Sequence, residues 1–346
     1  MRELHASLSK RLQLTLVVGL VGLIAAVGCG RPGESDGDKV VLKVGQVLPA
    51  DHPTSRAMSF FKGRLEELSV GRIDVRLFLS GQIGSANELI MECRLGNVEA
   101  AVVSTAPLAQ HVEILNVLVM PFVFRDNAHQ YAVVDGPIGR KLDRHLAERG
   151  IIAAAYFDSG SRNIMTKTGP IEAPDQLEGL KIRVMSSNVL RAAIDQLGGS
   201  AQPMSQAEVY SALQTGVIDG WENNPATCLV FSMYETGCTH FAWTRHVAIP
   251  DALILSRDWY DSLDEDLKRA VDQAADETRQ KQRELWREYE GQAIEQLKKA
   301  GMVFNEVDHE AFAEKFEGFY DRYTAQYGPE FGSLVEQIRD LDNSPR

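Results

Sequence analysis

The chain has few cysteines for its 346 residues and no excess of positive charge. Cysteines number four, and once Cys29 is assigned to an N-terminal signal, the odd set Cys93, Cys228 and Cys238 excludes a disulfide framework. A single bridge between Cys228 and Cys238 and buried free thiols both stay open. Lysine and arginine total 36 against 48 aspartate and glutamate, a net charge of −12, which argues against nucleic-acid binding.

Motifs of common cofactor, metal and catalytic sites are also missing. No phosphate-binding or ATP-binding motif occurs, and Cys238, His240 and His246 match no strong metal-ligand spacing. The sequence therefore predicts no cofactor and no enzyme, with one alternative: a secreted glycosidase, which would need two carboxylates. The candidate carboxylates are Asp219, Glu222 and Glu208. Asp219 is equally well explained as the turn residue of an Asp-Gly step.

Long apolar runs are confined to the N-terminus. Basic residues precede the run Leu12 to Val27, which is too short and too interrupted by glycine for a spanning helix, so residues 1–28 are predicted to be a signal peptide. The run ends in "AAVGCG", which resembles a bacterial lipoprotein signal with Cys29 as the lipidated residue. Cleavage into a soluble form stays open, because Ala26 stands where such signals more often carry leucine. Residues 29–39 then form a polar tether.

Strand and helix patterns alternate along the remaining chain. Strands are predicted over Val40–Leu48, Ile73–Ser80, Ala100–Ser104, Ile151–Phe157 and Leu180–Met185. Helices are predicted over Pro53–Leu68, Ser85–Leu95, Ala128–Arg149, Asn188–Leu197 and Gln206–Gln214, the last closed by Gly216. This alternation predicts an α/β fold with mostly parallel sheets. The chain length favours two lobes rather than one.

One helix is predicted to be unusually long. The pattern runs from Ser262 to Ala300, with a capping box of Ser262 and Glu265 at its start and Gly301 just past its end. A continuous helix of that length would reach roughly 50–60 Å at 1.5 Å per residue. We therefore expect it to cross both lobes.

Two arginines stand where a buried anion would bind. Arg183 lies inside a β-branched run that reads as a buried strand, and Arg162 follows the small residues Gly160 and Ser161. Two guanidinium groups suit one carboxylate, because their forked N–H donors match its oxygens. An internal pair with aspartate or glutamate, or a snorkelling side chain, is the alternative for each arginine.

A polar loop follows the predicted helix that ends at Gly216. In "GVIDGWENNPAT" a short apolar strand leads into Trp221, Glu222, Asn223 and Asn224 before Pro225. Ligands of open α/β sheets bind at such strand ends, and an asparagine amide offers both a donor and an acceptor. Helix capping is the alternative explanation for the two asparagines.

Several long motifs together resemble the solute-binding subunit, of DctP type, of tripartite ATP-independent periplasmic (TRAP) transporters. They are "GQIGSANELI", "MPFVFRDN", "GSRNIMTKTGPIEAPDQLEGLKIRV", "PMSQAEVYSALQTGVIDGWENN" and "TRHVAIPDALILS". The resemblance implies a two-lobed periplasmic-binding-protein clamshell with hinge strands and one long helix spanning both lobes. Lobe I would comprise residues 40–159 and 249–288, and lobe II residues 160–248 and 289–341.

The resemblance also implies a ligand site. Arg183 would pair with the ligand carboxylate, assisted by Arg162 and Asn223. The weaker candidates are Ser104, Ser186, Gln206, Glu88 and His52, with His246 as a hydrogen-bonding residue near the hinge. Trp221, Tyr156 or Phe122 would pack against a sugar ring, with a place in the core as the alternative for each.

The variant "GWENNP" and the later "ETGCTHFAWTRHVAIPD" resemble the subgroup that binds sugar acids such as glucuronate and galacturonate. A C4-dicarboxylate, a keto acid, or presentation of a ligand to a sensor are the alternatives. The implied protein is a periplasmic monomer, anchored to a membrane through Cys29 if that residue is lipidated. Its implied partners are the large and small membrane subunits of a TRAP permease.

Overall fold

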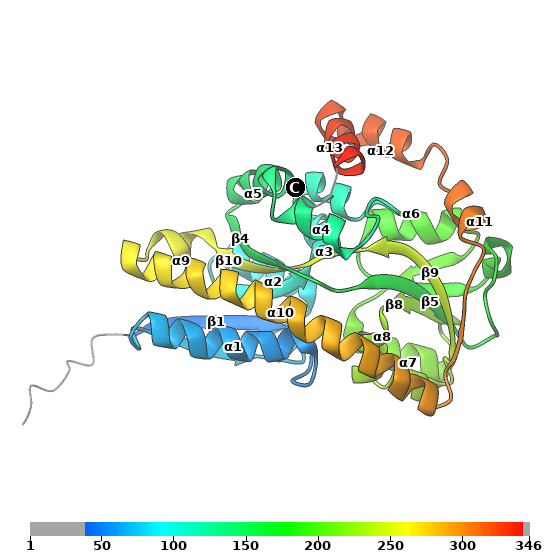
Figure 1. Cartoon of the computed structure of the whole chain (residues 1–346), viewed down its shortest axis with the longest axis horizontal. Coiled ribbons are helices and arrows are strands. Elements are labelled where there is room, and N and C mark those ends of the chain that lie inside the picture. The colour runs from blue at the N-terminus through cyan, green and yellow to red at the C-terminus, as the bar shows by residue number, and fades with distance from the viewer. Residues whose placement is uncertain (1–38, 342–346) are drawn as a thin grey trace, which may run out of the picture. The chain divides into compact units, whose positions relative to one another are not determined.

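Two β-sheets organise residues 39–341, the part of the chain that the computed structural model describes (Figure 1). The predicted signal peptide and Cys29 lie outside these residues. The first sheet contains, in spatial order, β2 (Ile73–Phe78), β1 (Val40–Gln46), β3 (Ala100–Ser104), β10 (Asp251–Ser256) and β4 (Ile151–Phe157). The second contains β11 (Val303–Asn305), β9 (His240–Ala248), β5 (Ser161–Thr166), β8 (Gly220–Asn223), β6 (Lys181–Val184) and β7 (Ser200–Pro203).

The chain crosses between the sheets twice in short links. Residues 158–160 join β4 to β5, and residues 249–250 join β9 to β10. The strand that enters each sheet, β5 or β10, runs antiparallel to both of its neighbours. Five of the nine strand pairings are parallel, as the prediction of mostly parallel sheets requires, and β5 and β10 are the exceptions. The reason is that each crossover enters a sheet at the end where its neighbours finish, so Asp251 pairs with Ser104 and with Phe157, the last residues of β3 and β4.

The first sheet is held by a helix with the predicted apolar spacing. Helix α1 (Pro53–Leu68) has the predicted bounds, and Met58, Phe61 and Leu65 are fully buried against β1 residues Leu42 and Val44. Each fully buried side chain of this size stabilises the fold by roughly 1.5–3 kcal/mol relative to an exposed one. Burial of this helical stripe fixes α1 on the sheet and places its N-terminus at the strand ends.

Other helices follow the predicted order, with small changes of boundary. They are α2 (Ala86–Arg94), α3 (Thr105–Leu108), α4 (Asn127–Val134), α5 (Pro137–Glu148), α6 (Asn188–Gln196), α7 (Gln206–Thr215) and α8 (Pro225–Val230). The single helix predicted over 128–149 is two helices, because Pro137 begins α5 and cannot continue α4. Helix α7 ends as predicted at Gly216, whose φ of 74° suits a residue without a side chain. Short 3₁₀ turns cover Glu113–Leu118, Pro174–Leu177 and Met233–Thr236.

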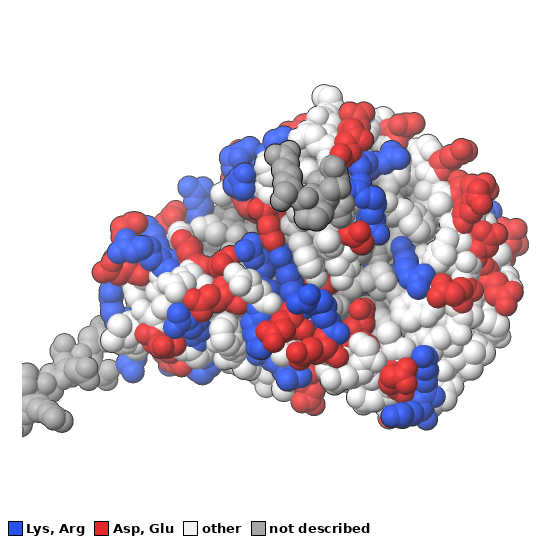
Figure 2. Space-filling view, viewed as in Figure 1, with Lys and Arg blue, Asp and Glu red and all other residues white. Residues whose placement is uncertain are grey.

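The long helix α10 (Glu265–Lys299) is present, and its start differs from the prediction. Asp264, not Ser262, caps it by accepting a hydrogen bond from the backbone N–H of Leu267 at 2.9 Å. The short helix α9 (Arg257–Asp261) ends at Ser262 instead. Charges of both signs cover the outward face of α10, in i to i+3 pairs such as Lys281 with Glu284 (Figure 2). These pairs leave that face without a patch of one sign.

Helix α10 connects the two halves of the fold. Its N-terminal half packs on α1 and β4 and buries Leu267 and Val271 in the core of the first sheet. Its C-terminal half packs on α8, and Leu297 is buried with second-sheet residues such as Trp221. The prediction that one long helix crosses both lobes is therefore confirmed, as Figure 1 also shows.

At its middle, α10 holds the first crossover. The side chain of Gln282 accepts from the Asp158 backbone N–H at 2.9 Å and donates to the Asp158 carbonyl at 2.7 Å. Gly160 has a φ of 61°, and a Cβ there would lie 2.8 Å from a Glu290 carboxylate oxygen. Only glycine fits this link without strain. The crossover is thus fixed next to the strand ends that build the site.

Three helices complete the described chain: α11 (His309–Glu314), α12 (Phe319–Tyr327) and α13 (Pro329–Asp340). Helix α13 packs on α5, while the Tyr323 hydroxyl of α12 donates to the Asn188 carbonyl at the start of α6. This segment therefore contacts helices of both sheets. Among residues 39–341, no helix is long and apolar enough to cross a membrane.

Candidate functional site

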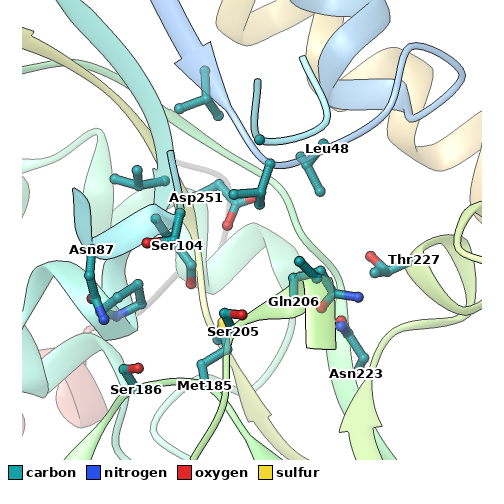
Figure 3. A pocket seen from close by; sticks show the side chains of 18 of the residues that line it. Leu48, Asn87, Ser104, Met185, Ser186, Ser205, Gln206, Asn223, Thr227 and Asp251 are labelled. Atoms are coloured by element: carbon teal, nitrogen blue, oxygen red, sulfur yellow. The ribbon is translucent and has the colours of Figure 1, made fainter. Parts of the chain in front are cut away.

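A cavity of about 400 Å³ lies where the two crossovers and the strand ends meet (Figure 3). Its first-sheet wall includes Ser104 at the end of β3 and Asp251 at the start of β10. Its second-sheet wall includes Arg183 of β6 and Asn223 at the end of β8. The volume is within the usual range for a small-molecule site, and polar groups from both sheets converge on it.

Arg183 is buried in this wall without a carboxylate partner among the described residues. Its side chain is 2% exposed. Its Nε and Nη2 donate to the Met204 carbonyl at 3.1 and 2.8 Å, and Nη1 donates to the Gln206 side-chain oxygen at 3.4 Å. A guanidinium has five N–H donors, so one remains on each terminal nitrogen. That pair matches the two oxygens of a carboxylate.

Burial lowers the pKa of Arg183 to about 10, and the negative charge of Glu222 opposes that shift. At neutral pH the guanidinium is still charged. A buried cation without an anion of its own is costly, whereas a bound anion would compensate it. The electrostatics of Arg183 therefore favour an anionic ligand.

Arg162 is held by an internal ion pair, as its alternative explanation anticipated. Its Nη2 donates to the Glu222 carboxylate at 2.8 Å and to the Glu222 carbonyl at 2.7 Å. Its Nε donates to the second carboxylate oxygen, and its Nη1 donates to the Asn223 side-chain oxygen at 3.2 Å. Four of five donors are used, so one N–H on Nη1 remains for a ligand. Arg162 lines the cavity, but Glu222 already compensates its charge.

The two adjacent asparagines have different roles. Asn224 caps α8, its side-chain oxygen accepting from the Thr227 N–H at 2.7 Å, as the capping alternative predicted. Asn223 lines the cavity, and its side-chain oxygen accepts from Arg162 and from the Asn224 backbone N–H at 2.9 Å. The amide N–H₂ of Asn223 is the group left to donate to a ligand.

The weaker candidates from the sequence also reach the cavity wall. They are Ser104, Ser186, Gln206, Glu88 and His52. The Nε2 of Gln206 is buried without a hydrogen-bond partner, which marks it as a donor for a ligand. Glu88 accepts from the Ser85 N–H at 2.8 Å in a capping box, so a helix-capping role explains much of its placement. Hydrogen bonds from Ser85 lower the pKa of Glu88.

His52 and His246 are both buried, and burial lowers the pKa of each to about 3, so both rings are neutral at physiological pH. His52 caps α1, and its second ring nitrogen lies 3.4 Å from the Thr227 hydroxyl across the cavity. His246 is not part of the cavity wall. Its ring bonds Thr244 at 2.8 Å and lies 3.8 Å from the Glu222 carboxylate. The assignment of His246 as a ligand residue is therefore corrected, because its side chain lies behind the Arg162–Glu222 pair.

Sequence reasoning missed several wall residues, of which Asp251 is the most informative. Its carboxylate faces the cavity in Figure 3, and burial raises its pKa to about 7, against the lowering effect of Arg162. In the sequence Asp251 is a single acidic residue directly before the apolar run "ALIL", and that pattern does not indicate that it faces a cavity. The other polar side chains missed are Ser80, Ser85, Asn87, Ser159, Ser205 and Thr227.

The aromatic residues proposed to contact a sugar ring do not line the cavity. Trp221 is fully buried in the core of the second sheet, and Tyr156 is buried with its hydroxyl donating to Asp143 at 2.9 Å. Phe122 packs edge-on against Phe316. Trp221 and Tyr156 are therefore core residues, as the alternative explanation stated, and Phe122 is partly buried against the core. The cavity contains one aromatic ring besides His52, that of Phe231.

The structure also bears on the alternatives for the cysteines, for a metal site and for Asp219. Cys228 and Cys238 are buried free thiols rather than a bridge. Within residues 39–341, no group of histidine, cysteine and acidic side chains has the arrangement of a metal site. Asp219 accepts from the Lys181 backbone N–H at 2.9 Å and does not line the cavity. Its turn role therefore accounts for it.

Comparisons with known proteins agree with this architecture. Residues 44–326 match the family model of the bacterial extracellular solute-binding proteins, family 7, or DctP. A solute-binding protein of Chromohalobacter salexigens is 31% identical over 339 residues, which cover 97% of this chain and 99% of the relative.

Solved structures agree as well. A TRAP periplasmic solute-binding protein from Sulfitobacter, with bound β-D-galacturonate, is 34% identical with a TM-score of 0.85, covering 87% of this chain and 100% of its own. One from Chromohalobacter salexigens, with bound D-glucuronate, is 33% identical with a TM-score of 0.84, covering 86% and 99%. The two-sheet fold, the long helix and the match over most of the length lead to one conclusion: this chain belongs to the DctP family of solute-binding proteins of TRAP transporters.

Proposed function

We propose that this protein captures a sugar acid such as D-galacturonate or D-glucuronate outside the cytoplasm and delivers it to a TRAP permease. The observation that carries the proposal is Arg183, a buried guanidinium with two unused N–H donors and no carboxylate partner among the described residues. A ligand carboxylate would satisfy both donors and the charge. The uronates bound by the Sulfitobacter and Chromohalobacter proteins support this ligand class.

The hydroxyl groups of a sugar acid suit the rest of the cavity. Gln206 has an unpartnered amide nitrogen, Asn223 an available one, and Arg162 one remaining N–H. Ser104 and Ser186 add hydroxyls that donate or accept, and Glu88 adds an acceptor at the first-sheet side. The Nδ1 of neutral His52 accepts from the Thr54 N–H, so its Nε2–H is a donor. A small neutral ligand would leave the charge of Arg183 uncompensated. The donor-rich wall therefore supports an anion that also carries several hydroxyls.

Binding without chemical conversion is part of the proposal. A glycosidase needs two carboxylates placed around the bond that breaks. Asp219 is used in a turn, and Glu222 is fully buried behind Arg162. Neither lines the cavity. The carboxylates that do line the described wall are Glu88 and Asp251, and Glu88 is held by the Ser85 N–H in the capping box of α2. Recognition of a ligand is the role that this wall supports best.

We propose the following lobes, hinge and partners for this function. Lobe I would comprise residues 40–159 and 249–288 and lobe II residues 160–248 and 289–341, with the links at 158–160 and 249–250 as the hinge. Closure of the lobes would exclude water and strengthen the Arg183 pair. We also propose a monomer held at a membrane by lipidated Cys29, with the permease subunits as partners.

A thermal-shift screen tests the ligand class directly. At ligand concentrations near a hundred times Kd, a uronate should raise Tm by about 5 °C, because binding to the folded state adds about 2.7 kcal/mol to its stability. D-Galactose and D-glucose, which carry the same hydroxyls without the carboxylate, should give no shift. A shift with C4-dicarboxylates or keto acids alone would preserve the role of Arg183 and refute the sugar-acid assignment.

A further inference from the structure

Asp251 places a buried carboxylate on the cavity wall, in addition to the more exposed carboxylate of Glu88. Asp251 is the first residue of β10, the strand that lies between β3 and β4 in the first sheet. It is 8% exposed. No cationic side chain among residues 39–341 forms an ion pair with its carboxylate within 4.0 Å. The Ser159 hydroxyl, in the neighbouring crossover, and Arg162, at the start of β5, both lower its pKa. Figure 3 shows the carboxylate beside Ser104, directed into the cavity.

The charges of the wall allow one ligand carboxylate. Arg183, on the second-sheet wall, is the cation without a carboxylate partner within 4.0 Å among the described residues. Arg162 is compensated by Glu222. A ligand carboxylate on Arg183 therefore leaves no uncompensated cation for a second one. At the first-sheet wall a second carboxylate would instead meet the like charge of Asp251, whereas a ligand hydroxyl would donate a hydrogen bond to it.

We propose that Asp251 is the specificity residue that restricts this site to polyhydroxy acids with a single carboxylate. Its carboxylate accepts hydrogen bonds from ligand hydroxyls and repels the second carboxylate of a dicarboxylic acid. The inference rests on the proposed function, since it assigns one wall of the same cavity. It makes aldarates and C4-dicarboxylates weaker ligands than uronates wherever Asp251 is ionised.

Calorimetry with two matched ligands tests this role. D-Galacturonate and D-galactarate have the same configuration at C2 to C5, and galactarate carries a carboxylate at both ends. Galacturonate closes a pyranose ring and galactarate stays open, so the ratio of their affinities is compared between protein variants. At pH 8, above the pKa of Asp251 of about 7, wild-type protein should bind galacturonate at least about a hundredfold more tightly than galactarate. Asp251→Asn keeps the size of the side chain and removes its charge. It should lower that ratio at least tenfold, mainly by tighter binding of galactarate.

The control variant is Asp74→Asn, which removes the same charge from β2 of the same sheet, where Asp74 pairs with Arg76 away from the cavity. It should leave the ratio unchanged. An unchanged ratio in Asp251→Asn, with wild-type binding of galacturonate intact, would overturn the role of Asp251 alone. Wild-type protein that binds neither D-galacturonate nor D-glucuronate would overturn the proposed function and this inference with it.

A second measurement follows the same preference as a function of pH in wild-type protein and in Asp251→Asn. Lowering the pH from 8 to 5.5 protonates Asp251, while Arg183 stays charged, His52 stays neutral and both ligand carboxylates stay ionised. Burial also raises the pKa of Glu290, on α10, to about 7, so the comparison with Asp251→Asn isolates the part that Asp251 contributes. Asp158, which also acts on the Asp251 carboxylate, has a pKa raised by its own burial. The preference for galacturonate over galactarate should fall at least tenfold in wild-type protein and stay constant in Asp251→Asn. Equal pH dependence in both proteins would contradict the inference.

Discussion

Replacing Arg183 with alanine is expected to lower the affinity for D-galacturonate by about thirtyfold to several thousandfold, or 2–5 kcal/mol. The physical reason is that the variant would bury the ligand carboxylate in a wall whose only unpaired guanidinium within the described residues has been removed. Truncating one member of a buried, hydrogen-bonded charge pair leaves the other without solvation or a partner. Isothermal titration calorimetry at neutral pH measures the effect.

One further variant separates the charge of Arg183 from the geometry of its N–H donors, and a second serves as a control. Arg183→Lys keeps the charge and loses the two parallel donors, so its affinity should fall between those of wild type and Arg183→Ala. Arg191→Ala removes an exposed arginine of α6 that pairs weakly with Asp195 at 3.8 Å, and it should bind as wild type does. Wild-type affinity in Arg183→Ala would refute the assignment of the carboxylate to this residue.

Replacing Glu222 with alanine is expected to destabilise the folded protein by about 3–5 kcal/mol. Glu222 is fully buried, and its carboxylate compensates Arg162, which is itself 5% exposed. The variant would leave a buried guanidinium without its anion and three of its hydrogen bonds altered or lost. The free energy of unfolding from urea denaturation, taken without ligand, measures this loss.

A double replacement serves as the control for this pair. Arg162→Met with Glu222→Leu removes both charges and keeps apolar volume, so most of the lost stability should return. The same double variant should still bind a sugar acid, because Arg183 is unchanged. Its affinity should be lower than that of wild type, because the free N–H of Arg162 is lost. A loss below about 1 kcal/mol in Glu222→Ala would mean that the pair contributes no more than an exposed one.

The sequence allowed much of the fold to be predicted, because the informative patterns are local. The apolar spacing of Met58, Phe61 and Leu65 fixed the bounds of α1, and the run Ile151–Phe157 is β4 without change. Sheet direction was less accessible, since β5 and β10 take theirs from the crossovers rather than from their own residues. The polar edge strand β7, Ser200–Pro203, carries no apolar alternation and was missed.

For the site, residues could be nominated from sequence, but their partners could not. The resemblance implied that Arg183 pairs with the ligand and that Arg162 assists, but the local sequence did not reveal their partners. The structure shows that Arg162 pairs with Glu222 and that Arg183 donates to the Met204 carbonyl. Asp251 was overlooked because nothing in its local pattern reveals that the start of β10 faces a cavity. His246 was placed at the site by its neighbourhood in the chain, yet alternation along β9 puts it behind Glu222.

The central claim is that Arg183 recognises a sugar acid by its carboxylate. Calorimetric titration of the wild-type protein with D-galacturonate and with its methyl ester tests it most directly, because the ester keeps every hydroxyl and loses only the charge. The account predicts clear binding of the acid and affinity at least about thirtyfold weaker for the ester. Equal affinity for the two ligands would contradict it.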